Sequence, residues 1–299
     1  MERCVRSVRL SKSQQVMVVL TVCSLVLFYS LFFMFPIGYA FVGSFSNWMP
    51  TKHLFSFVGL ENYQKVFQQS ALALSMTNTL LFTVIVTLAR TALGLIFAVL
   101  IHSMPRGKAL FRTIYFIPVI TSTVAVSMVW KWMLEPSNGP LNYYFGLLGI
   151  PNQLFLKDSS QALYCVMLMT IWKEMGYAMV MYMAGLTGIP SSLYEAAEID
   201  GCTRLQAFRY LTLPLLRNTT QFVLLTSFVS FCQTFTQIDL MTSGGPGTSS
   251  YTMVYYLYQE AFSKHRFGRA SAIAFILFAV ILVFSVLQFR LQRKGDDSE

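Results

Sequence analysis

Six long apolar runs constrain the fold of this chain more than any other feature of its sequence. Each run is about 20 residues or longer, the length at which a helix rising about 1.5 Å per residue crosses the roughly 30 Å of a bilayer's hydrocarbon. We therefore expect an all-α polytopic membrane protein. Its six transmembrane helices are predicted at about residues 16–42, 77–101, 110–134, 162–185, 219–241 and 267–289.

The composition agrees with this class and excludes several others. Of the 299 residues, 55% are apolar and 12% are charged, and the mean hydropathy is +0.55. The chain has no P-loop, no dinucleotide-binding glycine fingerprint and no His-Glu-x-x-His motif, and its five cysteines show no metal-ligand spacing. We expect no catalysis, no metal and no bound cofactor in this chain. The net charge of +9 is spread along the membrane rims, so we expect no nucleic-acid partner either.

Basic residues in the loops predict the orientation, because they favour the cytoplasmic side. Thirteen of them fall on the side that holds both termini, and seven on the other. We expect a cytoplasmic tail at 1–15, a permease domain at 16–290 and a second cytoplasmic tail at 291–299. The stretch 44–76 is polar enough to lie outside the membrane. Pro36 is expected to kink the first helix and Pro118 to interrupt the third.

A polar island lies between the fourth and fifth apolar runs, within a loop at 189–217. Ser192 stands three residues before Glu195, the spacing of a capping box, which predicts the start of a short helix. Gly201 predicts a left-handed turn at the end of that helix. Small side chains at 196 and 197 share a face beside two glutamates. From spacing alone, this surface suits a close joint with a protein or a position on lipid headgroups equally well.

The loop resembles a known signature. The run Leu193-Tyr194-Glu195-Ala196-Ala197-Glu198-Ile199-Asp200-Gly201, followed by Leu211-Thr212-Leu213-Pro214-Leu215, is similar to the EAA loop of binding-protein-dependent ABC importers. In that family the loop is a coupling helix that seats in the cytoplasmic ATP-binding subunit. The resemblance implies the ABC importer permease fold and a coupling role for Glu195, Ala196, Ala197, Glu198, Asp200, Gly201, Leu213 and Pro214.

Other segments resemble the carbohydrate branch of these importers, and more narrowly the F-type subunit of maltose transporters. They lie at 57–63, 112–118, 130–136, 240–246 and 267–272. The resemblance implies a permease that imports a sugar or oligosaccharide across the bacterial cytoplasmic membrane by alternating access. It implies as partners two copies of an ABC ATP-binding subunit, which carry the ATP and Mg, a different, G-type permease subunit and an extracytoplasmic sugar-binding protein.

Three charged residues fall near the middle of predicted membrane helices, away from their ends: Arg90, Lys173 and Glu174. A charge at the bilayer centre costs roughly 2.5 to 3.5 kcal/mol on insertion scales, so each should face protein or water. One interpretation is a polar translocation path. The other, which we favour for Arg90, is a structural ion pair with Glu174, because the adjacent side chains of 173 and 174 do not face each other along a helix.

The maltose-type resemblance also implies a sugar path. Thr170, Lys173, Glu174 and Tyr177 recur at helical spacing on one face, and this face contributes to the sugar site in that family. The other matching positions are Thr123, Ser230, Gln233, Thr234 and Gln237. The charges at 173 and 174 replace neutral residues of the maltose proteins, which allows a more polar or charged sugar. The alternative is helix–helix hydrogen bonding without a ligand.

Two further questions stay open in the sequence. The aromatic residues Trp130, Trp132, Tyr143 and Tyr144 suit a sugar ring, but an aromatic belt at the outer membrane surface explains them more simply.

The rival functions are an ion-gradient-driven secondary transporter and a polytopic membrane enzyme. The first predicts inverted repeats with discontinuous helices, the second a catalytic cluster, and the sequence shows neither a convincing repeat nor such a cluster.

Overall fold

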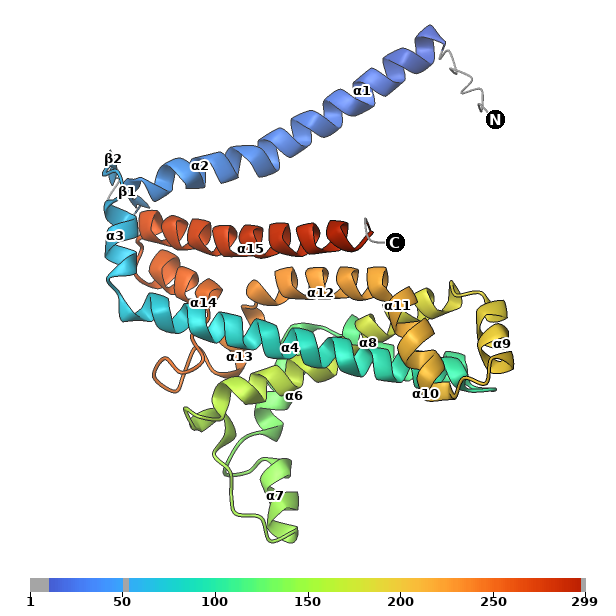
Figure 1. Cartoon of the computed structure of the whole chain (residues 1–299). Coiled ribbons are helices and arrows are strands. Elements are labelled where there is room, and N and C mark those ends of the chain that lie inside the picture. Colours follow the sequence, from blue (N-terminus) through green and yellow to red (C-terminus); the bar gives the residue numbers. More distant parts are fainter. Residues whose placement is uncertain (1–10, 51–53, 297–299) are drawn as a thin grey trace.

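A computed structural model describes residues 11–50 and 54–296, which are almost entirely helical (Figure 1). Most of the predicted N-terminal tail, residues 1–10, and the last three residues of the C-terminal tail lie outside the described residues. The prediction of an all-α protein needs one correction. Strands β1 (Ser46–Met49) and β2 (Leu54–Phe57) form an antiparallel hairpin in which Ser46 pairs with Phe57.

The first helical rod comprises α1 (Lys12–Tyr29), the π-helical turn η1 (Ser30–Met34) and α2 (Phe35–Ser44). The π-helical turn η1 ends at Met34, two residues before Pro36, where we predicted a kink. Proline cannot donate to the carbonyl four residues earlier and crowds it, which widens the preceding turn, while its own place in the first turn of α2 needs no donor. No residue of α1 is buried, and Figure 1 shows α1 diverging from the other helices.

The second helix is longer than predicted. After the hairpin and α3 (Glu61–Phe67), α4 (Ser70–Ser103) begins at Ser70 rather than near residue 77. Tertiary packing explains the extra turns, because Leu72 joins a core cluster and the Ser75 hydroxyl lies 3.2 Å from the sulfur of Met253. The end of the stretch that we expected outside the membrane is therefore part of α4.

The third predicted helix is two helices, α5 (Lys108–Ile120) and α6 (Thr123–Met133), bent by 91°. Pro118 lies inside α5, which ends two residues later at Ile120, and the break covers residues 121–122. The Thr121 hydroxyl donates to the Pro118 carbonyl oxygen at 2.6 Å and so closes the end of α5. The prediction of an interruption is confirmed, but its position is wrong.

The fifth predicted helix is also broken, into α12 (Arg217–Cys232) and α13 (Thr236–Met241). Between them the carbonyl of Thr234 accepts from the Thr252 hydroxyl at 3.2 Å instead of continuing the helix. The last helix, α15 (Phe267–Asp296), continues past residue 289, because Leu, Gln, Arg and Lys there are good helix formers. The tail expected from 291 thus begins as helix.

The remaining elements connect and complete this bundle. They are α7 (Pro140–Leu147), the 3₁₀ turn η3 (Phe155–Lys157), α8 (Ala162–Thr187), α9 (Ser191–Ile199), α10 (Arg204–Ala207), the π-helical turn η4 (Phe208–Thr212), α11 (Leu213–Leu215), α14 (Met253–Tyr258) and the π-helical turn η5 (Gln259–Ser263).

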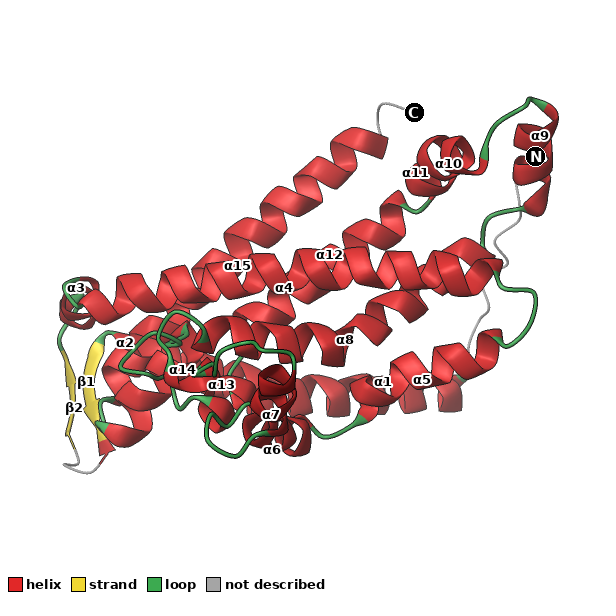
Figure 2. Ribbon diagram, turned by 90° about the horizontal axis from the view of Figure 1, so that it is seen from below, coloured by secondary structure: helices red, strands yellow, loops and turns green. Residues whose placement is uncertain are grey.

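Helix α8 packs between α4 and α5 through glycines. A Cβ added at Gly94 of α4 would lie 2.5 Å from the Cβ of Ala178, and one at Gly176 would overlap the carbonyl oxygen of Tyr115 on α5. Small residues let helix backbones approach closely where lipid supplies no hydrophobic drive for association. Helix α12 lies against α4 and α15, and Figure 2 shows these helices together.

Three helices of the described chain are long and apolar enough to cross a membrane, at 12–44, 70–103 and 267–290. The bent pair α5–α6 makes a fourth if it is one span. Helix α12 has 16 residues, fewer than the roughly 20 of a typical span. A mostly helical membrane protein is confirmed, and six spans stay a prediction.

Candidate functional site

A polar cavity of about 240 Å³ lies where α6, α8, α12 and α13 meet. Both helix breaks supply its walls, because Thr123 is the first residue of α6 and residues 233–237 lie at the break between α12 and α13. Its lining residues are Thr123, Thr170, Lys173, Glu174, Ser230, Phe231, Gln233, Thr234, Phe235, Thr236 and Gln237. The cavity therefore brings together the predicted path residues of all three segments, with Tyr177 as the one exception.

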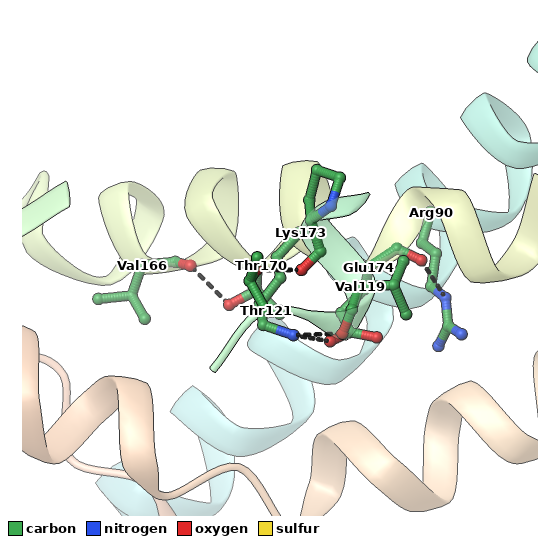
Figure 3. Close-up of polar contacts among 8 residues, drawn as sticks. Arg90, Val119, Thr121, Val166, Thr170, Lys173 and Glu174 are labelled. Carbon is green, nitrogen blue, oxygen red and sulfur yellow. Dashed lines mark hydrogen bonds and ion pairs between the residues drawn. The ribbon is translucent and has the colours of Figure 1, made fainter. Parts of the chain in front are cut away.

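Lys173 is fixed by the end of a neighbouring helix. Its Nζ donates to the carbonyl oxygen of Val119 at 3.2 Å and lies 3.1 Å from Oε1 of Glu174 (Figure 3). The last carbonyls of a helix have no partner within that helix, so the bend after α5 leaves the Val119 carbonyl free for Lys173. The Lys173 side chain is 6% exposed and that of Glu174 is 27% exposed. The two charges thus compensate each other inside the cavity wall.

Arg90 does not form the predicted ion pair with the Glu174 carboxylate. Its Nε donates to the main-chain carbonyl oxygen of Glu174 at 3.1 Å (Figure 3). Its Nη1 donates to the Ser227 hydroxyl at 3.1 Å. The carboxylate instead pairs with Lys173, whose long side chain reaches its neighbour in sequence. Arg90 is 4% exposed and connects α4, α8 and α12.

Tyr177 packs against that arginine and is not among the described residues that line the cavity. The guanidinium carbon of Arg90 lies 4.8 Å from the centroid of the Tyr177 ring and 5.3 Å from that of Phe231. Such cation–π contacts stabilise a desolvated guanidinium. The spacing that placed Tyr177 on the path face is correct, but the ring covers Arg90 rather than facing the cavity.

Three residues that line the cavity were not predicted from the sequence: Phe231, Phe235 and Thr236. Thr236 belongs to a polar run at 233–237 within an apolar segment, and this run is a usable signal for a helix break. The two phenylalanines carry no signal, because a chain with 26 phenylalanines uses most of them for packing.

The chemistry of the cavity is that of hydrogen bonding and stacking. Hydroxyl and amide groups dominate its wall, two aromatic rings border them, and the Thr170 hydroxyl donates to Val166 at 2.8 Å and so keeps an acceptor free (Figure 3). No group of His, Cys, Asp or Glu among the described residues could hold a metal ion. The wall fits a ligand that carries many hydroxyls.

The loop at 189–217 lies at the opposite end of the molecule from the β-hairpin (Figure 1). Its capping box is not where we predicted it. Pro190 is the N-cap of α9, Ser192 lies inside that helix, and no side chain caps it. A capping box forms instead between Thr203 and Gln206 at the start of α10, where the N-cap residue has the extended backbone that this motif needs.

The left-handed turn at Gly201 is confirmed, with φ of +76°. Its N–H donates to the Glu198 carbonyl at 3.0 Å, and the next N–H donates to that of Ala197 at 2.9 Å, which satisfies the end of α9. The segment that follows α10 also contacts α9, because the hydroxyls of Tyr194 on α9 and Thr212 in η4 lie within hydrogen-bond distance, 3.0 Å apart. The loop is therefore a hook with two connected limbs.

The hook is exposed in this single chain. Glu195, Glu198 and Asp200 are exposed and Ala197 is half-buried. Beside the acidic groups, Ile199 is 87% exposed, Leu205 75% and Tyr210 72%. Large apolar side chains gathered on an exposed surface and rimmed by charge indicate a contact with another molecule.

Comparison with known proteins identifies the family. Residues 90–295 match the family described as "Binding-protein-dependent transport system inner membrane component". This chain belongs to that family. The predicted resemblance is confirmed, and the family decides against an ion-gradient-driven secondary transporter. It also makes this chain a transport subunit of the inner membrane.

Relatives align over most of the chain. A probable ABC transporter permease protein of Pyrococcus horikoshii is 35% identical over 259 residues, covering 85% of this chain and 88% of the relative. The sn-glycerol-3-phosphate transport system permease protein UgpA of Pectobacterium atrosepticum is 32% identical, covering 88% and 90%. A bacterial ABC transporter involved in the import of the acidic polysaccharide alginate has a chain with the same fold, at a TM-score of 0.84 and 22% identity, covering 94% and 96%.

Proposed function

We propose that this chain is the permease subunit of an ATP-driven importer that carries a sugar or oligosaccharide across the bacterial cytoplasmic membrane. The observation that carries the proposal is the cavity between α6, α8, α12 and α13, whose wall of hydroxyls, amides and two rings suits a polyhydroxylated ligand. Relatives named for sn-glycerol-3-phosphate and for alginate support a hydroxyl-rich substrate.

The same proposal includes six spans with both termini in the cytoplasm. Helix α8 and the broken helix α12–α13 would supply the two spans beyond the three long apolar helices and the bent pair. Both pack against α4, a candidate span itself. The excess of basic residues on the side of the hook supports this orientation.

The proposal includes the partners that the family resemblance implies, and the exposed hook supports one of these contacts. Two ABC ATP-binding subunits would carry ATP and Mg, and one of them would receive the hook at 189–217 with its acidic and apolar side chains. A different, G-type permease would complete the pathway, and an extracytoplasmic sugar-binding protein would deliver the substrate. One solved relative is an alginate transporter in complex with a periplasmic protein bound to an alginate pentasaccharide.

The mechanism uses α8 as a rigid connection. Helix α8 continues from the cavity to Thr187, and α9 begins after a short turn. From Lys173 to Thr187 the helix spans about 21 Å at about 1.5 Å per residue. A movement of α9 with the ATP-binding subunits would therefore shift the cavity wall. The bond between Tyr194 and Thr212 would carry the same movement into α12.

The test is reconstitution. The chain would be co-expressed with candidate ATP-binding, permease and binding-protein subunits, and ATP-dependent uptake of labelled saccharides into proteoliposomes would be measured. We expect uptake of at least one saccharide, and its loss when Gln233 and Gln237 are both replaced by alanine. A control variant, Gln15→Ala at the far end of the molecule, should transport normally. Uptake without ATP, or no uptake of any saccharide, would contradict the proposal.

A further inference from the structure

A second, larger groove lies outside the helix bundle, at the base of the arm that carries α7. It measures about 590 Å³, within the roughly 300 to 1,000 Å³ of small-molecule sites. Trp132 at the end of α6 and Tyr143 and Tyr144 on α7 contribute aromatic rings, and Asn138 and Asn152 contribute amides. Figure 1 shows α7 projecting away from the bundle.

Hydrogen bonds from one side chain hold the backbone on both sides of the groove. Asn142 holds its two edges together, because its Nδ2 donates to the carbonyls of Pro136 (3.1 Å) and Gln153 (2.8 Å) and its Oδ1 accepts from the Gln153 N–H (3.0 Å). Gly139 allows the tight approach, since a Cβ there would lie 2.7 Å from the carbonyl oxygen of Met133. The backbone that carries the recognition groups is thus held in place before any ligand arrives, which lowers the entropy cost of binding.

The rings are open to contact. Trp132 is 62% exposed, Tyr143 67% and Tyr144 61%, and the two tyrosine rings meet edge to face with centroids 5.5 Å apart. Trp130, two residues before Trp132 on the same helix, turns inward and packs on Trp172 with a centroid distance of 5.8 Å. The four aromatic residues that the sequence groups together therefore divide into one core residue and three groove residues.

An aromatic belt in the lipid headgroups would explain the three exposed rings taken singly, but it leaves their concave arrangement with amides unexplained. Belt residues need one apolar side toward lipid and one polar tip toward water. Here the rings share a concave surface with amides, and the side chains of Asn138 and Asn152 have no hydrogen-bond partner among the described residues. Amides without a partner are costly in hydrocarbon, so we expect the groove to open to water or to hydrated headgroups and not to the membrane core.

Aromatic faces beside free amides are the chemistry that binds sugars, whose C–H faces stack on rings and whose hydroxyls bond to amides. Helix α6 links this groove to the cavity. Thr123 at its start lines the cavity and Trp132 near its end lines the groove. Trp132 is nine positions after Thr123, a rise of about 13.5 Å at about 1.5 Å per residue.

We propose that the groove is a second saccharide-binding site, which holds the outer units of an oligosaccharide while its leading end enters the cavity. This inference rests on the proposed function and adds a preference for chains over single sugars. Shorter saccharides reach the cavity alone and gain nothing from the groove.

The test compares chain lengths in the complete reconstituted transporter. Maltose to maltohexaose, cellobiose to cellohexaose and oligogalacturonates of two to six units would be used as probes, with uptake and saturation-transfer NMR as readouts. For the saccharide series that is transported, we expect Tyr143→Ala with Tyr144→Ala to weaken binding of the longer members about tenfold, as loss of two ring contacts implies. Uptake of the disaccharide should be unchanged.

Matched controls separate binding from damage to the arm. Leu147 and Leu148, 69% and 75% exposed on the same arm, do not line the groove, so their double alanine variant should bind all lengths normally. Asn152→Ala should weaken only the longer saccharides, by several-fold.

Three outcomes decide the matter. Equal binding of every length by the double tyrosine variant and the unchanged protein would overturn the second site and leave the proposed function intact. Quenching of Trp132 fluorescence by lipids with brominated acyl chains would also overturn it, because the ring would then face lipid. Absence of uptake for every saccharide would contradict the proposed function, and this site with it.

Discussion

At the scale of single residues, charge compensation decides how this bundle tolerates three charged side chains. Lys173 and Glu174 neutralise each other 3.1 Å apart, and Arg90 is satisfied by a carbonyl, a hydroxyl and two rings. Neither arrangement follows from spacing, because the partners of Lys173 and Arg90 include main-chain carbonyls from helices distant in sequence.

The Lys173–Glu174 pair gives a prediction of non-additivity. Glu174→Gln leaves the buried ammonium with Val119 alone, and Lys173→Gln leaves the carboxylate unpaired. Removing one partner of a buried pair costs about 3 to 5 kcal/mol where the pair is fully buried, and less here because Glu174 is 27% exposed. We expect each single variant to lower the unfolding temperature of the purified complex more than the double variant does. Additive losses in this double-mutant cycle would show that the two side chains act independently.

Gly201 gives a second prediction at this scale. Its φ of +76° is unfavourable for a side chain that is branched at Cβ, so Gly201→Val should strain the hook by about 1 kcal/mol or more. No atom lies within 4 Å of the added Cβ, so the effect is conformational and not steric. We expect an assembled complex whose ATP hydrolysis no longer drives uptake, measured as the ratio of the two rates.

A matched control exists in the same chain. Gly149 has φ of +73° and an equally open surrounding, but lies in the arm after α7. Gly149→Val should suffer the same strain and keep the coupling ratio. Loss of coupling in both variants, or in neither, would remove the specific role of the hook.

At the scale of elements, close helix contacts hold the cavity wall in place. Helix α8 presents Gly176 to the main chain of α5, and the end of α5 in turn presents the Val119 carbonyl to Lys173. The position of α5 therefore sets the position of a charged group in the cavity.

Gly176→Ala tests this packing. Its methyl group would overlap the Tyr115 carbonyl oxygen, a main-chain atom that cannot move alone, so α5 must shift. We expect a loss of stability of about 1 to 3 kcal/mol, the usual cost of overpacking, and weaker substrate binding. Gly146→Ala on α7 is the control, because nothing lies within 4 Å of its Cβ and alanine favours helix by about 1 kcal/mol. Equal thermal stability of the two variants would show that the contact of α5 with α8 is loose.

At the scale of the whole molecule, the hook and the β-hairpin lie at opposite ends (Figure 1). In the proposed topology the membrane lies between them, with the hook in the cytoplasm and the hairpin outside. In a chain whose native cysteines are replaced by serine, an impermeant maleimide should label Ser56→Cys in intact cells and label Thr203→Cys only after permeabilisation. Both positions are exposed on the protein, so a difference in labelling would report the side of the membrane and not burial within the fold. External labelling of Thr203→Cys would reverse the topology.

The sequence by itself determined the membrane class, the family and the identity of most cavity residues. The length of an apolar run can be read from the local sequence, and the thickness of the bilayer sets the length that a spanning helix needs. The glycine turn at Gly201 is equally local, because few other residues adopt that backbone conformation. Helical spacing predicted that Thr170, Lys173 and Glu174 share one face. It did not predict which elements that face contacts.

Only the tertiary structure decided where the helices break, which partners the charges take and how the aromatic residues divide. The breaks after Ile120 and Cys232 are stabilised by groups that bond the freed carbonyls, among them Thr121, Lys173 and Thr252. Trp130 and Trp132 differ in role because the packing of α6 turns one ring into the core and the other outward. These features depend on contacts between segments far apart in the chain, and a pattern along one segment does not contain them.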